Sequence, residues 1–255
     1  MVIRDWSSDV CSSDLAHMDE LCFRPFRYFD DGFVELTPLA YIPAIAANHR
    51  IKFSPTGVHA ILIVEGKDSS HKYYADVGAC NKSEAQSLIP PLSNGAYLGT
   101  IEKSSSLCAG KNFDDRAGCA VIVQTLLDFV AGDTLVVGIF TAREETGDWP
   151  VIELVRCCQN NNIWPDLIVN LEACPGGPTP VDKNPEAYVG KGVVIANTDR
   201  FYATDSKVCR FMCETAHKYQ VHHQHMTIRS GGGEMGRLAL SFGVLSSSLT
   251  IPVRY

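Results

Sequence analysis

The stretch 134-TLVVGIFTAREETG-147 places a run of eight mostly apolar residues shortly before two adjacent glutamates, Glu144 and Glu145. A short, continuous apolar run bounded by polar residues predicts a strand that is buried on both faces. Helical patterns flank this strand, at 118–130 before it and at 150–159 after it. Strands that alternate with helices predict an α/β fold with a mixed, mainly parallel sheet flanked by helices.

The same alternation continues toward the C-terminus, whereas the region before it has a different pattern. Further elements are predicted as strands at 166–171, 192–196 and 244–251 and as helices at 206–219 and 234–242. Short strand-like segments separated by turns stand at 50–53, 59–64 and 73–77, after a predicted hairpin at 21–29 and 33–36. We therefore expect a main domain of 16–39 and 109–255, interrupted by a small inserted β-domain at 40–108.

The N-terminal segment 5-DWSSDVCSSDL-15 repeats Ser-Ser-Asp and resembles the translation of a sequencing adapter. The alternative is a genuine polar tail. The segment lacks the apolar core of a signal peptide. We therefore expect residues 1–15 to lie outside the fold, and we interpret the chain as a gene fragment that is truncated at both ends.

Composition narrows the class of protein. The chain has 255 residues, 45% of them hydrophobic, and a formal net charge of −7, so it can bury a substantial core and carries no basic patch for nucleic acid. We find no apolar run near the roughly 18 residues that a membrane span needs. The ten cysteines lack a Cys-x-x-Cys motif, although Cys209 and Cys213 stand at helical spacing. Unpatterned cysteines favour reduced thiols and a cytoplasmic protein without membrane attachment.

One histidine and several carboxylates stand near the ends of apolar runs: His17 and Asp19, Asp114, Glu144 and Glu145, and Glu172. Strand-end loops can bring such residues together at one edge of a parallel sheet. Two adjacent glutamates at the end of a buried strand are costly unless a cation balances their charges. A pair of divalent metal ions is the simplest balance.

The chemistry of metal-assisted hydrolysis divides these residues by role. A carboxylate near the metals must accept the proton of the attacking water, and another must bind metal. Glu144 and Glu145 could share these two roles. Asp19, two residues after His17 on the same side of a strand, could accept the second N–H of the imidazole and fix its tautomer.

Four motifs occur in the order AHMDELCF (16–23), NFDDRAGC (112–119), REETGDW (143–149) and IPVRY (251–255). Together they resemble the glutamyl aminopeptidase family of co-catalytic metallopeptidases, which includes the tetrahedral aminopeptidases. The segment YYADVGACNKSEAQ (73–86) resembles the inserted β-domain of that family. The resemblance implies a zinc-peptidase-like fold and hydrolysis of N-terminal residues from peptides with two divalent ions, zinc or cobalt.

The resemblance also assigns roles by position. It implies that His17 binds one metal, Asp114 bridges both, Glu144 is the general base and Glu145 is a terminal ligand. Glu172 falls near the next acidic ligand, with Asn170 as a competing alignment; we prefer Glu172, because an anion suits a divalent ion better than an amide does. Peptide substrates and a homo-oligomer follow from the same likeness, as a dimer building block or a dodecamer joined through residues 40–108.

The chain also departs from the family pattern. Cys22 replaces a usual glycine, and 231-GGGEM-235 stands in place of Gly-Gly-Thr-Asp-Ala. A final histidine ligand is expected two residues after Tyr255, beyond the sequence given, so we expect this polypeptide to bind its second metal poorly and to be inactive by itself. Two alternatives remain open: a metal-dependent deacylase or carboxypeptidase on a related fold, and a catalytically deficient relative that serves as a binding or scaffold subunit.

Overall fold

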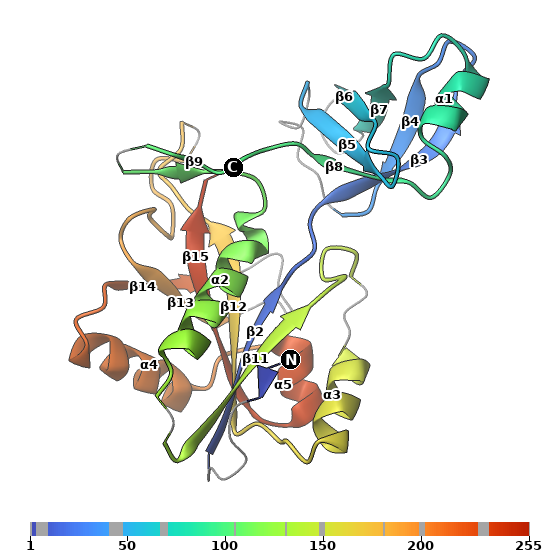
Figure 1. Ribbon diagram of the computed structural model, residues 1–255. Helices are drawn as coiled ribbons and strands as arrows, with labels where there is room; N and C mark the ends of the chain where they lie inside the picture. The colour runs from blue at the N-terminus through green and yellow to red at the C-terminus, as the bar shows by residue number, and fades with distance from the viewer. Residues whose placement is uncertain are drawn as a thin grey trace. The chain divides into compact units, whose positions relative to one another are not determined.

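The computed structural model describes residues 2–3, 10–40, 48–66, 71–104, 106–130, 132–147, 151–180, 182–198, 202–228 and 235–254. The chain divides into two compact units, drawn in Figure 1. The main unit comprises Met1–Asp19, Phe113–Glu144 and Asp148–Tyr255. The barrel unit comprises Glu20–Asn112 and Glu145–Gly147.

A mixed sheet forms the centre of the main unit. Among the described residues its strands follow the order β1 (Val2–Ile3), β11 (Thr134–Thr141), β2 (Val10–His17), β12 (Leu167–Pro175), β15 (Leu245–Val253), β13 (Val193–Thr198) and β14 (His223–Thr227). Neighbours from β11 to β15 run parallel, and so do β13 and β14. The pairs β1–β11 and β13–β15 are antiparallel. The predicted α/β fold with a mainly parallel sheet is therefore confirmed.

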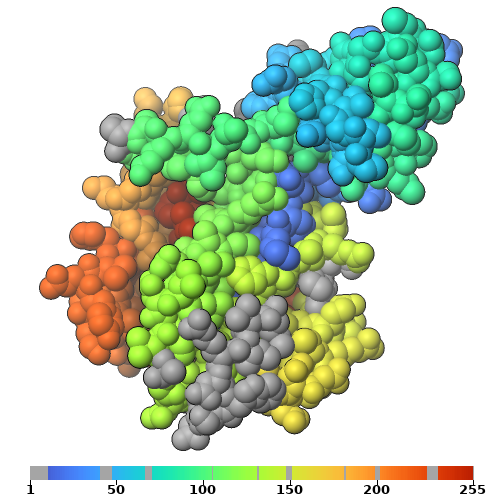
Figure 2. Space-filling view, viewed as in Figure 1, coloured from blue at the N-terminus to red at the C-terminus, as the bar shows by residue number. Residues whose placement is uncertain are grey.

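Helices cover both faces of this sheet. They are α2 (Phe113–Asp128), α3 (Val151–Asn160), α4 (Ser206–Lys218) and α5 (Met235–Phe242). Because side chains alternate along a strand, Val136 of β11 packs with the residues of α2 and Val137 with those of α3 and α5. On β12, Leu167 and Val169 pack against α4, and Leu171 packs with the α2 cluster. Thus α2 and α4 share one face, the one visible in Figures 1 and 2.

The N-terminal segment contradicts one expectation. We expected residues 1–15 to lie outside the fold, yet β2 begins at Val10 and pairs with β11 on one side and β12 on the other. Cys11, Ser13 and Leu15 are buried at alternate positions of this strand. A strand that ends at His17 in the middle of a sheet needs residues before it to complete the pairing, and 10–15 fill that place.

The barrel unit is a closed antiparallel barrel, with one short helix among its described residues. Its strand order is β3 (Cys22–Tyr28), β4 (Val34–Pro38), β7 (Lys72–Asp76), β6 (His59–Glu65), β5 (Arg50–Ser54) and β8 (Asn94–Tyr97). The helix is α1 (Lys82–Leu88), and β9 (Glu102–Lys103) pairs with β10 (Cys108–Ala109). The predicted hairpin forms β3 and β4, but it belongs to this barrel. The unit therefore begins at Glu20, about one hairpin earlier than the predicted residue 40.

The two ends of the segment Glu20–Asn112 meet at the side chain of Glu20. Lys111 Nζ donates hydrogen bonds to Glu20 Oε2 and to the carbonyl of Tyr97, each at 2.7 Å. Asn112 Nδ2 donates to the same glutamate oxygen, also at 2.7 Å. The carboxylate of Glu20, inside the motif 16–23, thus binds Lys111 and Asn112, at the start of the motif 112–119.

In the barrel core, the aromatic ring of Phe53 packs directly over Gly95. Phe53 of β5 is fully buried and pairs in register with Gly95 of β8. A Cβ atom at Gly95 would lie 2.7 Å from Phe53 Cε1, closer than real contacts allow, so glycine is required by the ring above it. Ile51 and Leu62 complete the surroundings of this ring in the same buried cluster.

We predict that Phe53→Ala destabilises the barrel unit by about 3–5 kcal/mol, because it leaves a cavity that the closed barrel cannot fill. The midpoint of urea unfolding, followed by tyrosine fluorescence and circular dichroism, measures the loss. Phe211→Ala, at a position 58% exposed on α4, is the matched control and should change stability by no more than about 0.5 kcal/mol. Equal effects of the two substitutions would contradict this packing.

Candidate metal site

Three adjacent parallel strands bring the candidate residues together. His17 is the last residue of β2 and pairs in register with Thr141, the last residue of β11. The chain then turns to Glu144 three residues later. On the other side of β2, Glu172 lies inside β12, which runs to Pro175 and is longer than the predicted strand at 166–171. The carboxyl ends of these strands therefore meet at one edge of the sheet, as the sequence predicted.

The imidazole of His17 is the centre of the site. Its side chain is only 2% exposed, and its Nε2 atom lies 2.9 Å from Asp114 Oδ1, 3.6 Å from Glu172 Oε1 and 3.9 Å from Glu144 Oε2. Asp114 stands at the start of α2, where its backbone is not yet helical, and its side chain is 56% exposed. One ring nitrogen thus faces carboxylates from three separate segments, with Asp114 on the solvent side.

Asp19 links the histidine to the glutamate loop. Its Oδ1 atom lies 3.5 Å from His17 Nδ1, which is too long for a strong hydrogen bond, so the predicted bond from the second N–H of the ring stays a prediction. The same oxygen accepts a hydrogen bond from the backbone N–H of Glu144 at 3.2 Å. Asp19 therefore fixes the start of the 144–147 turn beside the ring.

The carboxylates and the imidazole shift one another's protonation. Burial lowers the pKa of His17, but the neighbouring carboxylates, Asp114 first and then Asp19 and Glu172, outweigh burial and raise that pKa. Burial raises the pKa of Glu172 well above its usual range, and the charge of Asp114 raises it further. Burial also raises the pKa of Glu144. Without a cation, these acids are therefore costly to ionise together.

Asp115 is a buried member of this region to which the sequence analysis gave no role. It is fully buried, and its Oδ1 accepts the backbone N–H of Gly118 at 3.0 Å. Burial is the main reason that the pKa of Asp115 rises to about 7. A Cβ atom at Gly118 would lie 2.5 Å from this carboxylate, so the glycine allows the first turn of α2 to close over it. In the sequence, only its position next to Asp114 pointed to a role for Asp115.

The remaining residues predicted from the sequence are Glu145, Asn170 and the positions after them, and their places in the structure differ. Glu145 is half-buried in the turn that groups with the barrel unit, so its role as a ligand stays a prediction. Asn170, the competing alignment for Glu172, is buried and donates a hydrogen bond to Ser248 Oγ at 3.3 Å. The predicted loop 231–234 and Tyr255 lie outside the described residues.

The donor atoms of this group suit a divalent cation. One atom each from His17, Asp114 and Glu172 lies within 4.8 Å of the others. An imidazole nitrogen and two carboxylate oxygens are ligands that zinc accepts, and a cation among them would offset the charges that raise the pKa of the buried acid. Among the described helices, none has the length and apolar character needed to span a membrane.

The fold and this histidine–carboxylate group define an α/β protein with a candidate metal site at the carboxyl edge of its sheet. The family described as M42 glutamyl aminopeptidase matches residues 14–255, and the chain belongs to this family. A predicted aminopeptidase of Acetivibrio thermocellus is 26% identical over 249 residues, which cover 94% of this chain and 73% of the relative.

Solved structures share the fold. A TET aminopeptidase from the marine sediment archaeon Thaumarchaeota archaeon SCGC AB-539-E09 gives a TM-score of 0.87 at 21% identity, covering 99% of this chain and 76% of that chain. A TET1 peptidase of Pyrococcus horikoshii, which can assemble into a tetrahedron or a large octahedral shell, gives a TM-score of 0.77 at 19% identity, covering 97% of this chain and 77% of that chain.

Proposed function

We propose that this protein is a metal-dependent aminopeptidase that hydrolyses N-terminal residues from peptides. The observation that carries the proposal is the nearly buried His17 ring, whose Nε2 faces carboxylate oxygens from three segments of the chain. Membership of the M42 family supports an aminopeptidase over the deacylase, carboxypeptidase and scaffold alternatives. The similar proteins from Acetivibrio thermocellus and from archaea carry aminopeptidase names.

The donor atoms of the His17 group are of the kinds that bind a divalent ion. His17, Asp114 and Glu172 supply one nitrogen and two oxygen donors that lie close together, and burial makes the charge of Glu172 unfavourable without a cation. Asp114 would be the ligand that two ions share, and Glu145 would be a further ligand. When bound, two such ions, zinc or cobalt, supply Lewis acidity and a water of lowered pKa.

Glu144 has the position and the chemistry of a general base. Its Oε2 atom lies 3.9 Å from His17 Nε2, and its side chain is only 14% exposed. Burial raises the pKa of this carboxyl, which brings it nearer to the neutral range in which a group can both accept and return a proton. Glu144 then takes the proton of the attacking water and passes it to the leaving amine.

Asp19 acts as a positioning residue in this proposal. Its oxygen holds the backbone N–H of Glu144 and faces His17 Nδ1, so it orients both the base and the imidazole. A carboxylate behind a metal-binding histidine fixes the ring's tautomer and raises its basicity. The motif 16–23 therefore supplies a ligand and the group that orients it from one short segment.

We further propose that the protein assembles with copies of itself through the barrel unit. The barrel exposes large apolar side chains, among them Phe26 at 63% and Leu92 at 76%. Exposed apolar surface of this kind favours an interface between proteins. The Pyrococcus horikoshii peptidase, which shares the fold, forms tetrahedral or octahedral assemblies.

Substitution of the two adjacent glutamates tests the assignment of the base. In the full-length enzyme, Glu144→Gln should keep the fold and most bound metal, while turnover of an aminoacyl anilide falls by at least the roughly 10²–10⁴-fold that loss of a general base costs. Glu145→Gln should instead lose metal and recover part of its activity in excess Zn²⁺ or Co²⁺. Glu153→Gln, at an exposed position of α3, is the control that should change neither. The reverse pattern would mean that the two roles are exchanged.

Charges placed on the barrel test the assembly. Phe26→Asp and Leu92→Asp should lower the molar mass measured by size-exclusion chromatography with light scattering, because a buried charge weakens an apolar interface. Leu127→Asp, at a position 66% exposed on α2, should leave the mass unchanged. A monomeric unchanged protein, or an assembly that tolerates both barrel substitutions, would refute this part of the proposal.

A further inference from the structure

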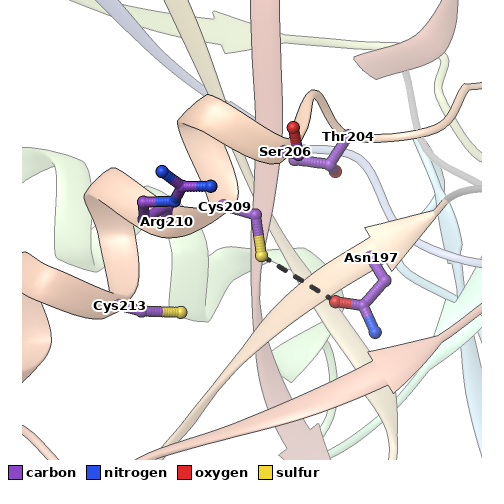
Figure 3. Close-up of a pocket in the computed structure, with 6 residues that line it drawn as sticks. All are labelled: Asn197, Thr204, Ser206, Cys209, Arg210 and Cys213. Atoms are coloured by element: carbon purple, nitrogen blue, oxygen red, sulfur yellow. Dashed lines mark hydrogen bonds between the residues drawn. The ribbon is translucent and has the colours of Figure 1, made fainter.

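A second group of metal-binding side chains lies between α4 and the strands β13 and β14. Cys209 and Cys213 stand four residues apart on α4, so both point from the same side of the helix. His225 lies on β14, and one atom from each of the three residues is within 4.8 Å of the others. The two sulfurs and Asn197 of β13 line a pocket of about 450 Å³, shown in Figure 3. This group shares no residue with the His17 site.

The spacing of the donors fits a tetrahedral ion. Cys213 Sγ lies 3.6 Å from His225 Nε2. A tetrahedral zinc ion with bonds of about 2.3 Å to sulfur and about 2.05 Å to nitrogen holds these two atoms about 3.6 Å apart. Both cysteines are half-buried and pack beside the Val208 and Met212 core, whereas His225 is exposed. The two sulfur donors are therefore packed against the core, and the nitrogen donor is open to solvent.

Asn197 orients the imidazole for coordination. Its Oδ1 atom lies 3.3 Å from His225 Nδ1, and the same oxygen lies 4.0 Å from Cys209 Sγ. An amide oxygen can only accept a hydrogen bond, so Nδ1 carries the proton and Nε2 presents its lone pair toward Cys213. A second ring, His223, contacts the edge of His225 with centroids 5.7 Å apart and limits its rotation. Metal-binding histidines are oriented in this way by partners behind the ring.

We propose that Cys209, Cys213 and His225 form a zinc site that joins α4 to the edge strand β14, with a water molecule as the fourth ligand. Thiolates are soft donors and imidazole also suits zinc, so this donor set selects zinc over magnesium or calcium. Two thiolates neutralise the ion, which suits a pocket that Arg210 also lines. Each thiol releases its proton to solvent when the ion binds.

Two other arrangements compete with a zinc site. The first is a simple S–H···N hydrogen bond from Cys213 to His225, which the 3.6 Å distance also allows. In that arrangement Cys209 donates its S–H to Asn197 Oδ1 at 4.0 Å, and neither thiol loses its proton. The second is a disulfide between Cys209 and Cys213, which binds no metal and is removed by a reductant. Both alternatives predict that the reduced protein gains no metal–thiolate bond.

Cobalt titration of the metal-stripped full chain, under a phosphine reductant, tests the site without any measurement of activity. Co²⁺ bound by thiolates gives a sulfur-to-metal charge-transfer band in the near ultraviolet, which ligands such as those at the His17 site do not give. The band should saturate at one equivalent bound at this site and disappear when Zn²⁺ is added. Asn197→Ala should keep the band but weaken Zn²⁺ affinity about 10- to 100-fold, because it removes only the orienting hydrogen bond.

Matched cysteine variants complete the test. Cys209→Ser, Cys213→Ser and His225→Gln should each lose the tetrahedral cobalt spectrum while the far-ultraviolet circular dichroism stays unchanged. Cys80→Ser, at an exposed position in the barrel unit, should keep it. The proposal is overturned if the reduced protein shows no charge-transfer band at saturating Co²⁺, or if the band survives in both Cys209→Ser and Cys213→Ser.

Discussion

The Nε2 atom of His17 lies 2.9 to 3.9 Å from carboxylate oxygens of three chain segments, on a ring that solvent barely reaches. Burial is the main reason that Glu172 and Glu144 are costly to ionise, and the neighbouring carboxylates add to that cost. The arrangement follows from the sheet, because the parallel strands β11, β2 and β12 bring Glu144, His17 and Glu172 to the same edge. A bound cation would offset the repulsion, and the same proximity that makes the metal-free group costly makes it a good ligand set.

Much of this site could be predicted because its signals are local. The strand Thr134–Thr141 and the helix beginning at Ser206 follow from apolar periodicity, and the acids that follow buried strands indicate a shared edge. The continuation of β12 past Glu172 could not be predicted, since that strand extends by pairing with β15, which is distant in sequence. For the same reason β2 was missed: residues 10–15 look polar locally, and only pairing on both sides places them in the sheet.

The boundary predicted at residue 40 differs from the structure, in which the barrel unit begins at Glu20, for a related reason. The hairpin of β3 and β4 has the same local pattern whether it belongs to the main unit or to the barrel, and closure of the barrel decides between them. The group of Cys209, Cys213 and His225 was similarly hidden, because helical spacing relates two of its members but only the sheet brings the third. In the resulting account, the main unit combines an oxygen-rich group at the strand ends with a sulfur-rich group beside α4. Their different donors should select ions by different chemistry.

Metal binding at His17 would give the carboxylate group at this edge of the sheet its purpose. Crystals of the protein grown with Zn²⁺ and measured on both sides of the zinc absorption edge locate each ion by its anomalous scattering. We expect an anomalous peak in contact with His17 Nε2, Asp114 and Glu172, with a second peak on the other side of Asp114 if that residue bridges two ions. A fully occupied peak at Cys209 and Cys213 with none beside His17 would contradict the central claim, because the carboxylate group would then be formed for some purpose other than holding a metal.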